Sequence, residues 1–341
     1  MAAIGVFAIP VIDAGFDTEA AWHGWRGLGG RGAIARLIAK ACEQVGFFAI
    51  TGHGVPDAVL QESRLAMAHY FALPLETKMR DAISGPDSPY GYSPIEGESL
   101  AATRAWQAGA RDHKESYSIG PTDRAGLAAN RWPAAHAVPD LRRAFTVRYH
   151  AMAQLASLLL ADMAQGVGLP RGWFVPLTDR GASAQRALHY PVGAEQPGGA
   201  AAHTDYGTLT ILETDPAVAG LEVLLGRRWH AVEVPPGALV VNIGDAMARW
   251  TCGRWRSTVH RVVMPSGARG PRQSCAFFHN ANADAIIAPL PGLAPRRSGW
   301  WRARRGGEDW APVRFGDYLE AKVRAAYGLP GDSMGRSRST V

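Results

Sequence analysis

The sequence predicts a mixed α/β (α+β) protein in which a helical N-terminal region precedes a β-sandwich or jelly-roll core. Two observations indicate this division. Between residues 34 and 163, apolar residues recur at the three- to four-residue spacing of amphipathic helices. From residue 184 onward, short apolar runs alternate with turn-forming residues, which is typical of a sandwich of short strands. The length of 341 residues is sufficient for a sizeable core.

Helical spacing is clearest in the first half of the chain. Apolar side chains from Ile34 to Val45 make one stripe, and Gly46 follows where a left-handed C-terminal cap belongs. Pro56 is suited to the first turn of a second helix. In order, we expect a strand at residues 9–13, a loop at 14–30, a helix ending before Gly46, a strand at 47–50, a helix from Pro56 to Ala72, and a long helix at 140–165.

Between the second and third helices, residues 80–135 are rich in glycine, proline and serine, and they predict a long irregular segment. Such a stretch is more often functional than accidental. Strands should follow at residues 185–190, 207–213, 220–224, 238–243, 257–264 and 273–279, then a helix at 313–327 and a polar, disordered tail at 331–341. We therefore divide the chain into an N-terminal region (1–178), a jelly-roll core (179–291) and a C-terminal segment (292–341).

Composition narrows the functional class. The net charge of +6 and the pI of about 9.4 could indicate nucleic-acid binding, but the basic residues are scattered and no zinc-finger spacing occurs. We interpret the charge as a solvated surface, with an anionic substrate as the alternative explanation. No apolar stretch reaches the roughly 20 residues of a membrane span. Three scattered cysteines favour a reducing cytoplasm over a disulfide framework, so we expect neither nucleic acid nor a membrane as partner.

The strongest functional pattern is His203-Thr204-Asp205. In an extended segment, residues two apart point to the same side, so the imidazole and the carboxylate can reach one metal ion. His260 lies in a second strand-like run, at residues 257–263, of the same β-rich region. Two histidines and one carboxylate on one face of a metal ion leave three positions open, and iron(II) is the natural occupant of such a facial triad.

An isolated H-x-D sequence is more often a surface turn, and His260 alone could be a core histidine. However, small residues from Gly198 to Ala202 precede His203, and they allow the chain to approach an ion closely. A competing H-x-E pattern at residues 113–115 lies in the irregular segment without a histidine on a paired strand, and we interpret it as structural. The sequence thus favours His203, Asp205 and His260 as metal ligands and catalytic residues.

Arg272 and Ser274 form a second candidate site in the strand-like run that follows His260. Alternation along a strand places the guanidinium and the hydroxyl on one face, which suits the binding of a carboxylate. A buried arginine needs such an anion, and an internal Asp or Glu could also provide it. Beside an iron triad, 2-oxoglutarate is the better candidate. The hydroxyl of Tyr190 could reach the same carboxylate, or Tyr190 could be a core residue.

Taken together, these residues resemble the isopenicillin N synthase-like family of iron(II)/2-oxoglutarate-dependent oxygenases. The resemblance covers almost the whole chain and follows the family's order of motifs. In the first half the motifs are Ile9-Pro10-Val11-Ile12-Asp13, Gly52-His53-Gly54-Val55, Gly91-Tyr92 and Asn130-Arg131-Trp132-Pro133. In the second half they are Leu209-Thr210-Ile211-Leu212, Gly220-Leu221-Glu222-Val223, Val241-Asn242-Ile243-Gly244-Asp245 and Arg272-x-Ser274.

The resemblance implies a double-stranded β-helix core with flanking helices, iron(II) at the triad, and 2-oxoglutarate at Arg272, Ser274 and Tyr190. It implies a cytoplasmic dioxygenase, a monomer or weak homodimer stimulated by ascorbate, that uses dioxygen to hydroxylate, desaturate or cyclise a small secondary metabolite or amino-acid derivative. Some relatives bind iron without 2-oxoglutarate, so an iron oxidase of the isopenicillin N synthase type is the alternative. A non-catalytic metabolite-binding module is a third and less favoured interpretation.

The substrate itself is not identified by the sequence. The irregular segment and the C-terminal part supply candidate residues for the wall of its pocket, although each of them could be a packing residue instead. These candidates are Tyr90, Tyr92, Ser93, Arg104, Phe278, Trp300 and Trp301.

Overall fold

The structure is a computed structural model of the chain. It describes residues 5–16, 31–85, 89–100, 112–122, 130–192, 199–215, 217–265, 268, 270–293 and 310–327. Most of the predicted loop at 14–30, the predicted tail at 331–341, and the wall candidates Arg104, Trp300 and Trp301 lie outside these residues. Within the described ranges, no helix combines the length and the apolar character that crossing a membrane requires.

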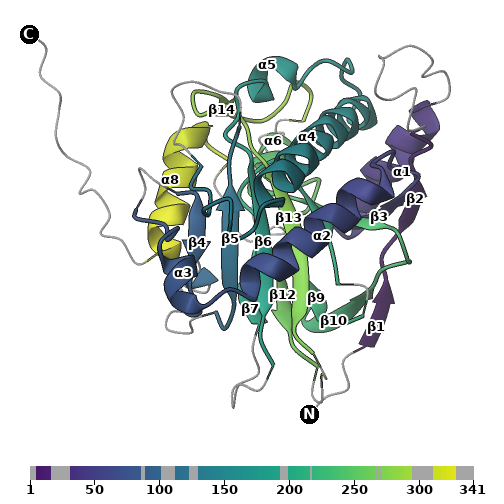
Figure 1. The fold of residues 1–341 in the computed structure, drawn as a ribbon. Coiled ribbons are helices and arrows are strands. Elements are labelled where there is room, and N and C mark those ends of the chain that lie inside the picture. The colour runs from purple at the N-terminus through teal and green to yellow at the C-terminus, as the bar shows by residue number, and fades with distance from the viewer. Residues whose placement is uncertain are drawn as a thin grey trace, which may run out of the picture.

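Two β-sheets form the centre of the molecule (Figure 1). The larger sheet contains, in order, β2 (Val11–Asp13), β3 (Phe47–Thr51), β11 (Leu239–Ile243), β8 (Leu209–Glu213), β13 (Arg272–His279), β6 (Ala184–Tyr190), β5 (Glu115–Ile119) and β4 (Gly91–Ser93). The smaller sheet contains β1 (Gly5–Ala8), β10 (Arg228–Glu233), β9 (Leu221–Leu225), β12 (His260–Val263) and β7 (Gly199–His203). From β6 to β13 the chain passes repeatedly between the sheets, which confirms the predicted jelly-roll core.

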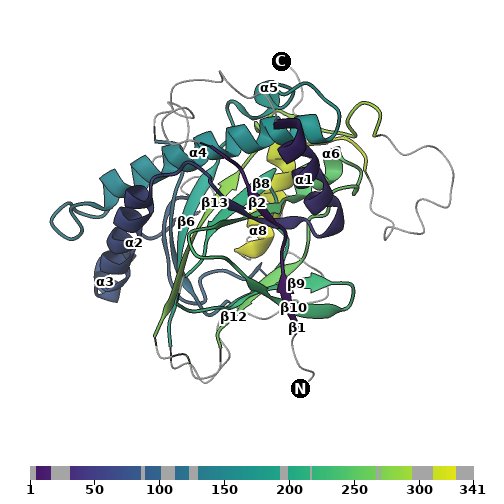
Figure 2. The ribbon, with the colours of Figure 1, turned by 90° about the vertical axis from the view of Figure 1, so that its right-hand side faces the viewer.

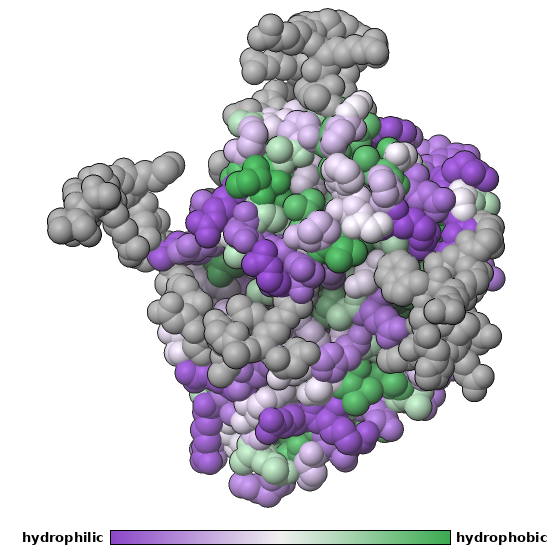
Figure 3. Space-filling model, turned by 90° about the horizontal axis from the view of Figure 1, so that it is seen from above, coloured by the Kyte–Doolittle hydropathy of each residue, from purple (hydrophilic) through white to green (hydrophobic). Residues whose placement is uncertain are grey.

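Helices cover the outer face of the larger sheet. The long helix α4 (Leu141–Gly166) crosses that sheet, and both α1 (Arg31–Gln44) and α2 (Asp57–Phe71) pack against α4 (Figure 2). The other described helices are α3 (Leu75–Met79), α5 (Val175–Thr178), α6 (Asp245–Trp250) and α8 (Phe315–Ala326), and α8 follows a two-stranded sheet of β14 (Ile286–Ile287) and β15 (Val313–Arg314). On the face shown in Figure 3, hydrophilic residues surround small groups of hydrophobic ones.

The apolar core has parts on both sides of the larger sheet. One part lies between the helices and the sheet and includes Leu155 of α4 and Phe277 of β13. Another lies between the two sheets and includes Phe47 of β3 and Val223 of β9. Because successive residues of a strand point to opposite faces, Phe277 and Phe278 of β13 face different parts of the core. The inward positions of the larger sheet are therefore those that can reach a site between the sheets.

The strands that the sequence did not predict carry few large apolar residues. Residues 80–135, predicted to be irregular, contain β4 and β5, and β5 pairs with β6 along its whole length. The predicted loop before His203 is strand β7, which consists of glycine and alanine up to that histidine, and β10 was also not predicted. Those predictions were wrong because pairing with distant strands, rather than a local apolar pattern, stabilises these segments.

The N-terminal residues belong to both sheets. Where one strand was predicted at residues 9–13, β1 pairs in parallel with β10 and β2 pairs in parallel with β3. Only Ile9 and Pro10 lie between these two strands, and Ile9 is buried between the sheets. This segment therefore connects the two sheets directly.

A buried ion pair joins α1 to α4. Asp162 of α4 is fully buried and accepts hydrogen bonds from Arg31, the first residue of α1, and from Arg171, which follows α4. Arg31 itself is only 6% exposed. Such a pair contributes to stability mainly because neither charge can be left alone in the interior.

We expect Asp162→Ala to lower the free energy of unfolding by about 3–5 kcal/mol, because Arg31 would remain buried without its main partner. Glu62→Ala is the matched control. It removes an ion pair between α2 and Arg143 of α4 that is exposed on both sides, so solvent already screens it and stability should change little. Urea denaturation of both variants measures the difference, and equal losses would contradict the importance of the buried pair.

Candidate functional site

The three predicted metal ligands come together between the sheets. His203, the last residue of β7, pairs directly across the sheet with His260, the first residue of β12. Asp205 lies two residues further on, in the loop that leads to β8. One ligand atom from each residue lies within 4.8 Å of the other two. Because β7 ends at His203, Asp205 reaches this point from the loop that follows the strand.

Backbone carbonyls fix the orientation of both imidazoles. Nδ1 of His203 lies 2.7 Å from the carbonyl oxygen of Ala201, and Nδ1 of His260 lies 3.1 Å from that of Thr258. A carbonyl oxygen only accepts, so each Nδ1 carries the hydrogen and each Nε2 keeps a lone pair for a metal. The two Nε2 atoms lie 3.8 and 3.7 Å from Oδ1 of Asp205. This donor set of two imidazole nitrogens and one carboxylate oxygen fits iron(II).

The charge states of these residues also suit metal binding. Burial and the neighbouring His260 lower the pKa of His203 to about 4, so its imidazole is neutral at neutral pH. Burial by itself would raise the pKa of Asp205, but the two histidines and two hydrogen bonds lower that pKa below its ordinary value. A neutral imidazole and an ionised carboxylate are the forms that bind a metal ion.

The second oxygen of Asp205 is held by the larger sheet. Oδ2 accepts hydrogen bonds from Oγ1 of Thr210 on β8, at 2.5 Å, and from Nδ2 of Asn242 on β11, at 2.6 Å. Both donors are buried on neighbouring strands, where they pair with one another in register. These hydrogen bonds direct Oδ1 toward the histidines, which is how residues around a metal ligand set its geometry.

A second carboxylate supports the metal-binding segments. Asp245, the first residue of α6, accepts hydrogen bonds from Oγ of Ser257 and the hydroxyl of Tyr318, both at 2.6 Å, and from Oγ1 of Thr204 at 3.3 Å. Thr204 separates two of the predicted ligands, and Ser257 lies three residues before the third. Asp245 therefore connects both metal-binding segments and α8.

Arg272 is buried without a carboxylate partner in the described part of the chain. Arg272 is the first residue of β13 and is 1% exposed. Its Nη1 donates a 3.2 Å hydrogen bond to Oγ of Ser274. Its Nε has no hydrogen-bond partner among the described residues. By contrast, the buried Arg148 pairs with Glu213 at 3.2 Å. The internal salt bridge that the sequence left open for Arg272 is thus not found within the described ranges.

The structure places Tyr190 and Ser274 beside Arg272, as the sequence predicts for a shared anion site. Tyr190 of β6 is the direct cross-strand partner of Arg272, and the centre of its ring lies 5.1 Å from the guanidinium carbon. Gly220 lies beside this side chain, where a Cβ would be 3.5 Å from Arg272 and only 2.8 Å from the carbonyl oxygen of Val263, so the tight approach is between the two backbones. The three polar groups therefore form one buried cluster that fits a carboxylate.

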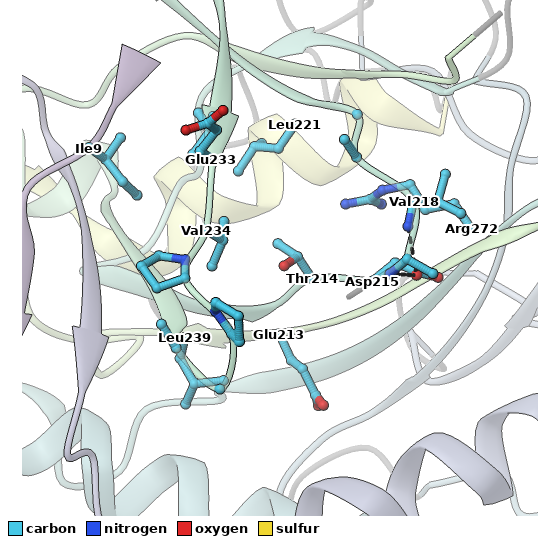
Figure 4. Close-up of a pocket in the computed structure, with 18 of the residues that line it drawn as sticks. Ile9, Glu213, Thr214, Asp215, Val218, Leu221, Glu233, Val234, Leu239 and Arg272 are labelled. Carbon is cyan, nitrogen blue, oxygen red and sulfur yellow. Dashed lines mark hydrogen bonds between the residues drawn. The ribbon is translucent and has the colours of Figure 1, made fainter. Parts of the chain in front are cut away.

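A cavity of about 710 Å³ also adjoins Arg272 (Figure 4). Figure 4 shows Arg272 next to Val218 and Asp215, with Ile9 and Val234 on the opposite side. The carboxylate of Asp215 accepts hydrogen bonds from three backbone amides. These bonds hold the segment after β8 in place, where it forms one wall of the cavity. None of the three candidate metal ligands lines this cavity, so it is separate from the triad.

The competing H-x-E pattern at residues 113–115 takes part in other contacts. Lys114 forms a buried ion pair with Glu98 at 2.7 Å. Glu115 accepts a 2.5 Å hydrogen bond from the hydroxyl of Tyr92, which pairs in register with Tyr117 on the outward face of the sheet. Tyr92 is therefore a packing residue rather than part of a pocket wall between the sheets.

Thr210, Asn242 and Asp245 are supporting residues that the sequence analysis did not assign. Asn242 interrupts the apolar run Leu239–Ile243 and is 2% exposed. A buried amide inside such a run needs a polar partner, because an unpaired buried polar group is costly. That interruption is the signal in the sequence that could have indicated its role.

Two family profiles match the chain. The profile described as non-haem dioxygenase in morphine synthesis N-terminal matches residues 9–135, and the 2OG-Fe(II) oxygenase superfamily profile matches residues 181–281. Validamycin A dioxygenase of Streptomyces hygroscopicus subsp. limoneus is 32% identical over 305 residues, which are 83% of this chain and 80% of the relative. The chain belongs to the 2-oxoglutarate–iron(II) oxygenase family.

Two further comparisons support this assignment of the chain to the oxygenase family. Proline hydroxylase buaE of Petromyces alliaceus is 33% identical over 276 residues, which are 76% of this chain and 85% of the relative. The crystal structure of a full-length Neurospora crassa protein in complex with alpha-KG has a TM-score of 0.76 at 27% identity, and the match covers 93% of this chain and 96% of that chain. The predicted family and double-stranded β-helix fold are confirmed, and iron(II) and 2-oxoglutarate are the oxygenase's cofactors.

We expect Asn242→Ala to raise the dissociation constant for iron(II) by about tenfold to hundredfold, because Asp205 would lose one of the donors that orient it. Asn282→Ala is the matched control, since it removes a buried amide that is hydrogen bonded to Pro176 and Asp179 instead. The control should leave the iron(II) affinity unchanged even where it lowers stability. Anaerobic calorimetric titration measures both, and equal affinities in the two variants would argue against the role of Asn242.

Proposed function

We propose that this oxygenase binds iron(II) through His203, Asp205 and His260 and oxidises a small organic molecule. When bound, iron(II) and 2-oxoglutarate supply the oxidising chemistry: 2-oxoglutarate loses carbon dioxide to give succinate, which gains one atom of dioxygen, and the other atom enters the substrate in hydroxylation or leaves as water in desaturation or ring closure. Hydroxylation is the default outcome, with desaturation or ring closure as variants. The names of the two relatives support a secondary metabolite or an amino-acid derivative as substrate.

The observation that carries the co-substrate part of this proposal is the cation of Arg272, which has no carboxylate partner among the described residues. A buried charge without a counter-ion is strongly unfavourable, so the position calls for an anionic ligand. The guanidinium can bind a carboxylate through two parallel hydrogen bonds, and Ser274 can add a third. We assign the distal carboxylate of 2-oxoglutarate to this site, with Tyr190 packed beside it.

The protein's contribution is to orient the reactants and to exclude water. The carbonyls of Ala201 and Thr258 hold the imidazoles, and Thr210 with Asn242 holds the carboxylate. A small apolar cluster between the sheets includes Leu188, Tyr190, Ala200 and Ala276, with partly buried neighbours around it. An apolar surrounding of this kind limits access of water to a metal site.

An iron oxidase that takes all its electrons from the substrate is the alternative. It would use the same three ligands and could place a substrate carboxylate at Arg272. We favour the 2-oxoglutarate-dependent reaction because the similar Neurospora crassa structure contains alpha-KG. A non-catalytic binding module is least favoured, because the three candidate metal ligands and the anion-binding residues Arg272 and Ser274 are all present.

We further propose that the protein works in a reducing cytoplasm as a monomer or weak homodimer, without a nucleic-acid or membrane partner. Cys42, Cys252 and Cys275 are all buried and no disulfide joins any two of them, which suits a reducing compartment. The division into residues 1–178, 179–291 and 292–341 also stays a proposal, and the two profile matches fall within its first two parts.

Oxygen uptake and succinate release by the purified protein with iron(II) test the proposed function. We expect both to require 2-oxoglutarate and to be lost in His260→Ala, because the variant retains only two of the three ligands. His150→Ala, an exposed histidine on α4, is the control and should keep wild-type activity. Oxygen uptake that ignores 2-oxoglutarate would point to the oxidase, and no uptake with any of a broad set of metabolites would point to a binding module.

We expect Arg272→Lys to weaken 2-oxoglutarate binding by about tenfold to hundredfold, because lysine keeps the charge but loses the planar fork. The affinity for iron(II) should stay unchanged, since Arg272 does not belong to the triad. Arg254→Lys, on an exposed arginine paired with Glu43, is the control. The apparent KM for 2-oxoglutarate measures the effect, and a KM equal to that of the wild type would remove Arg272 from the co-substrate site.

A further inference from the structure

Three residues on the inward face of β6 and β13 are partly exposed. Strand alternation points Ala184, Arg186 and Phe278 toward the space between the sheets, yet each is partly exposed. Their outward neighbours, such as Gln185, are fully buried under α4. Phe278 pairs in register with Thr210, the residue that holds Asp205. The partly exposed surface of Phe278 therefore lies beside the metal site, and we call the region between Arg186 and the triad the opening.

Arg186 places a cation on this wall. Its Nη1 donates to both oxygens of Glu98, at 3.1 and 2.9 Å, and its Nε donates to Oγ of Ser118 at 2.9 Å. In the described part of the chain its Nη2 has one long contact, 3.5 Å to the hydroxyl of Tyr327, and the side chain is 21% exposed. Glu98 is also paired with Lys114 at 2.7 Å, so its oxygens are already occupied. The remaining hydrogen-bonding capacity of this wall is that of a donor, which suits an oxygen acceptor.

Helix α8 places a second cation, Lys322, beside the metal-binding segment. At one end, the hydroxyl of Tyr318 donates to Asp245 beside the metal-binding segments, and at the other end the carbonyl of Ala326 accepts a hydrogen bond from the loop before β5. Lys322 lies midway on the same helical face, because residues four apart are neighbours. Its Nζ is 5.7 Å from the centre of the Tyr206 ring, in the residue after Asp205. Within the described ranges Lys322 forms no ion pair.

The acids around Arg186 are already paired with cations. Among these residues and their ion-pair partners, the cations Arg186, Lys114 and Lys322 face the acids Glu98 and Asp112, and both acids are already paired. In the larger sheet β6 is two strands away from β8, which is roughly 10 Å at the usual spacing of about 4.8 Å. A ligand that extends from Arg186 to the triad therefore has the size of a small metabolite.

We propose that the substrate is a small organic acid whose carboxylate binds between Arg186 and Lys322, while the carbon to be oxidised lies at the triad. Arg186 provides donors in a fixed orientation, since Glu98 and Ser118 hold its guanidinium, and Lys322 adds a second positive charge. Both are specificity-determining residues. This inference rests on the proposed function, because it names the substrate class of the same site. It also agrees with the net charge of +6, for which an anionic substrate was one explanation.

Matched acids and amides test the substrate class. The full chain, with iron(II) and 2-oxoglutarate, is titrated anaerobically with phenylacetate, cinnamate and octanoate and with the primary amide of each. We expect at least one acid to bind about tenfold or more tightly than its amide and to increase succinate release in air, because only the carboxylate forms charge-assisted hydrogen bonds. The proposal is wrong if no acid binds more tightly than its amide.

The proposed function is tested separately by the slow succinate release of the wild type without any added acid. If that release is present and depends on 2-oxoglutarate, while acids and amides bind equally, only the substrate class is rejected. If the release is absent with and without every acid and amide, the proposed function itself fails. The two failures are therefore distinguishable in one set of assays.

Arg186→Gln and Lys322→Met test the two residues. Each should weaken binding of the preferred acid by about tenfold to hundredfold, the loss expected for one hydrogen bond to a charge, and should leave binding of the amide unchanged. Lys322→Met should fold normally even where Arg186→Gln is unstable, because Lys322 is partly exposed. Arg143→Met, an exposed arginine on α4, is the matched control. A preference for acids that survives in both variants would overturn the assignment.

Discussion

The carboxylate of Asp205 links the two sheets at the candidate metal site. One oxygen faces the histidines of the smaller sheet, and the other is hydrogen bonded to Thr210 and Asn242 of the larger sheet. The geometry of the triad therefore depends on how the sheets pack, and not on the H-x-D sequence alone. A shift of one sheet against the other would separate Oδ1 from the imidazoles, because the larger sheet would keep the carboxylate. Apolar contacts between the sheets, such as Phe47 against the ring of His260 at 5.3 Å, thus serve the chemistry as well as stability.

Buried charged residues fall into two groups: those with an oppositely charged partner inside the protein stabilise the fold, and those without one are suited to binding a ligand. Asp162 and Glu213 have arginine partners inside the protein, so their charges are satisfied before any ligand arrives. Arg272 has no carboxylate partner among the described residues, and Nη2 of Arg186 has a long contact of 3.5 Å with the hydroxyl of Tyr327. Arg186 is four residues from the cross-strand partner of Arg272, which is about 13 Å along β6. Two anions bound at these positions would approach the triad from different directions and would not compete for one site.

Features that depend on local chemistry could be predicted from the sequence, and features that depend on distant partners could not. The helical stripe of α4 follows from its own residues, and the triad follows because few residue types bind iron(II). Strand β5 could not be predicted, because its polar Glu115 is satisfied by Lys78 and His189 from elsewhere in the chain. Strand β7 could not be predicted either, because its residues are selected by space: a Cβ at Gly199 would collide with the carbonyl of Val262. The sequence also could not show whether Arg272 has a carboxylate partner, because an Asp or Glu from any part of the chain could lie beside it in the fold.

The crossing of the chain at Ile9 and Pro10 determines how the protein would respond to trimming at its N-terminus. Strands β1 and β2 are short, and each occupies the outermost position of its sheet. A protease that cut after Asp13 would release both strands together and expose the amides and carbonyls of β10 and β3. Unpaired strand edges are templates for strands of other molecules. One cleavage would thus replace two short edge strands by the longer edges of β10 and β3, and would make the protein more prone to aggregation through strand pairing.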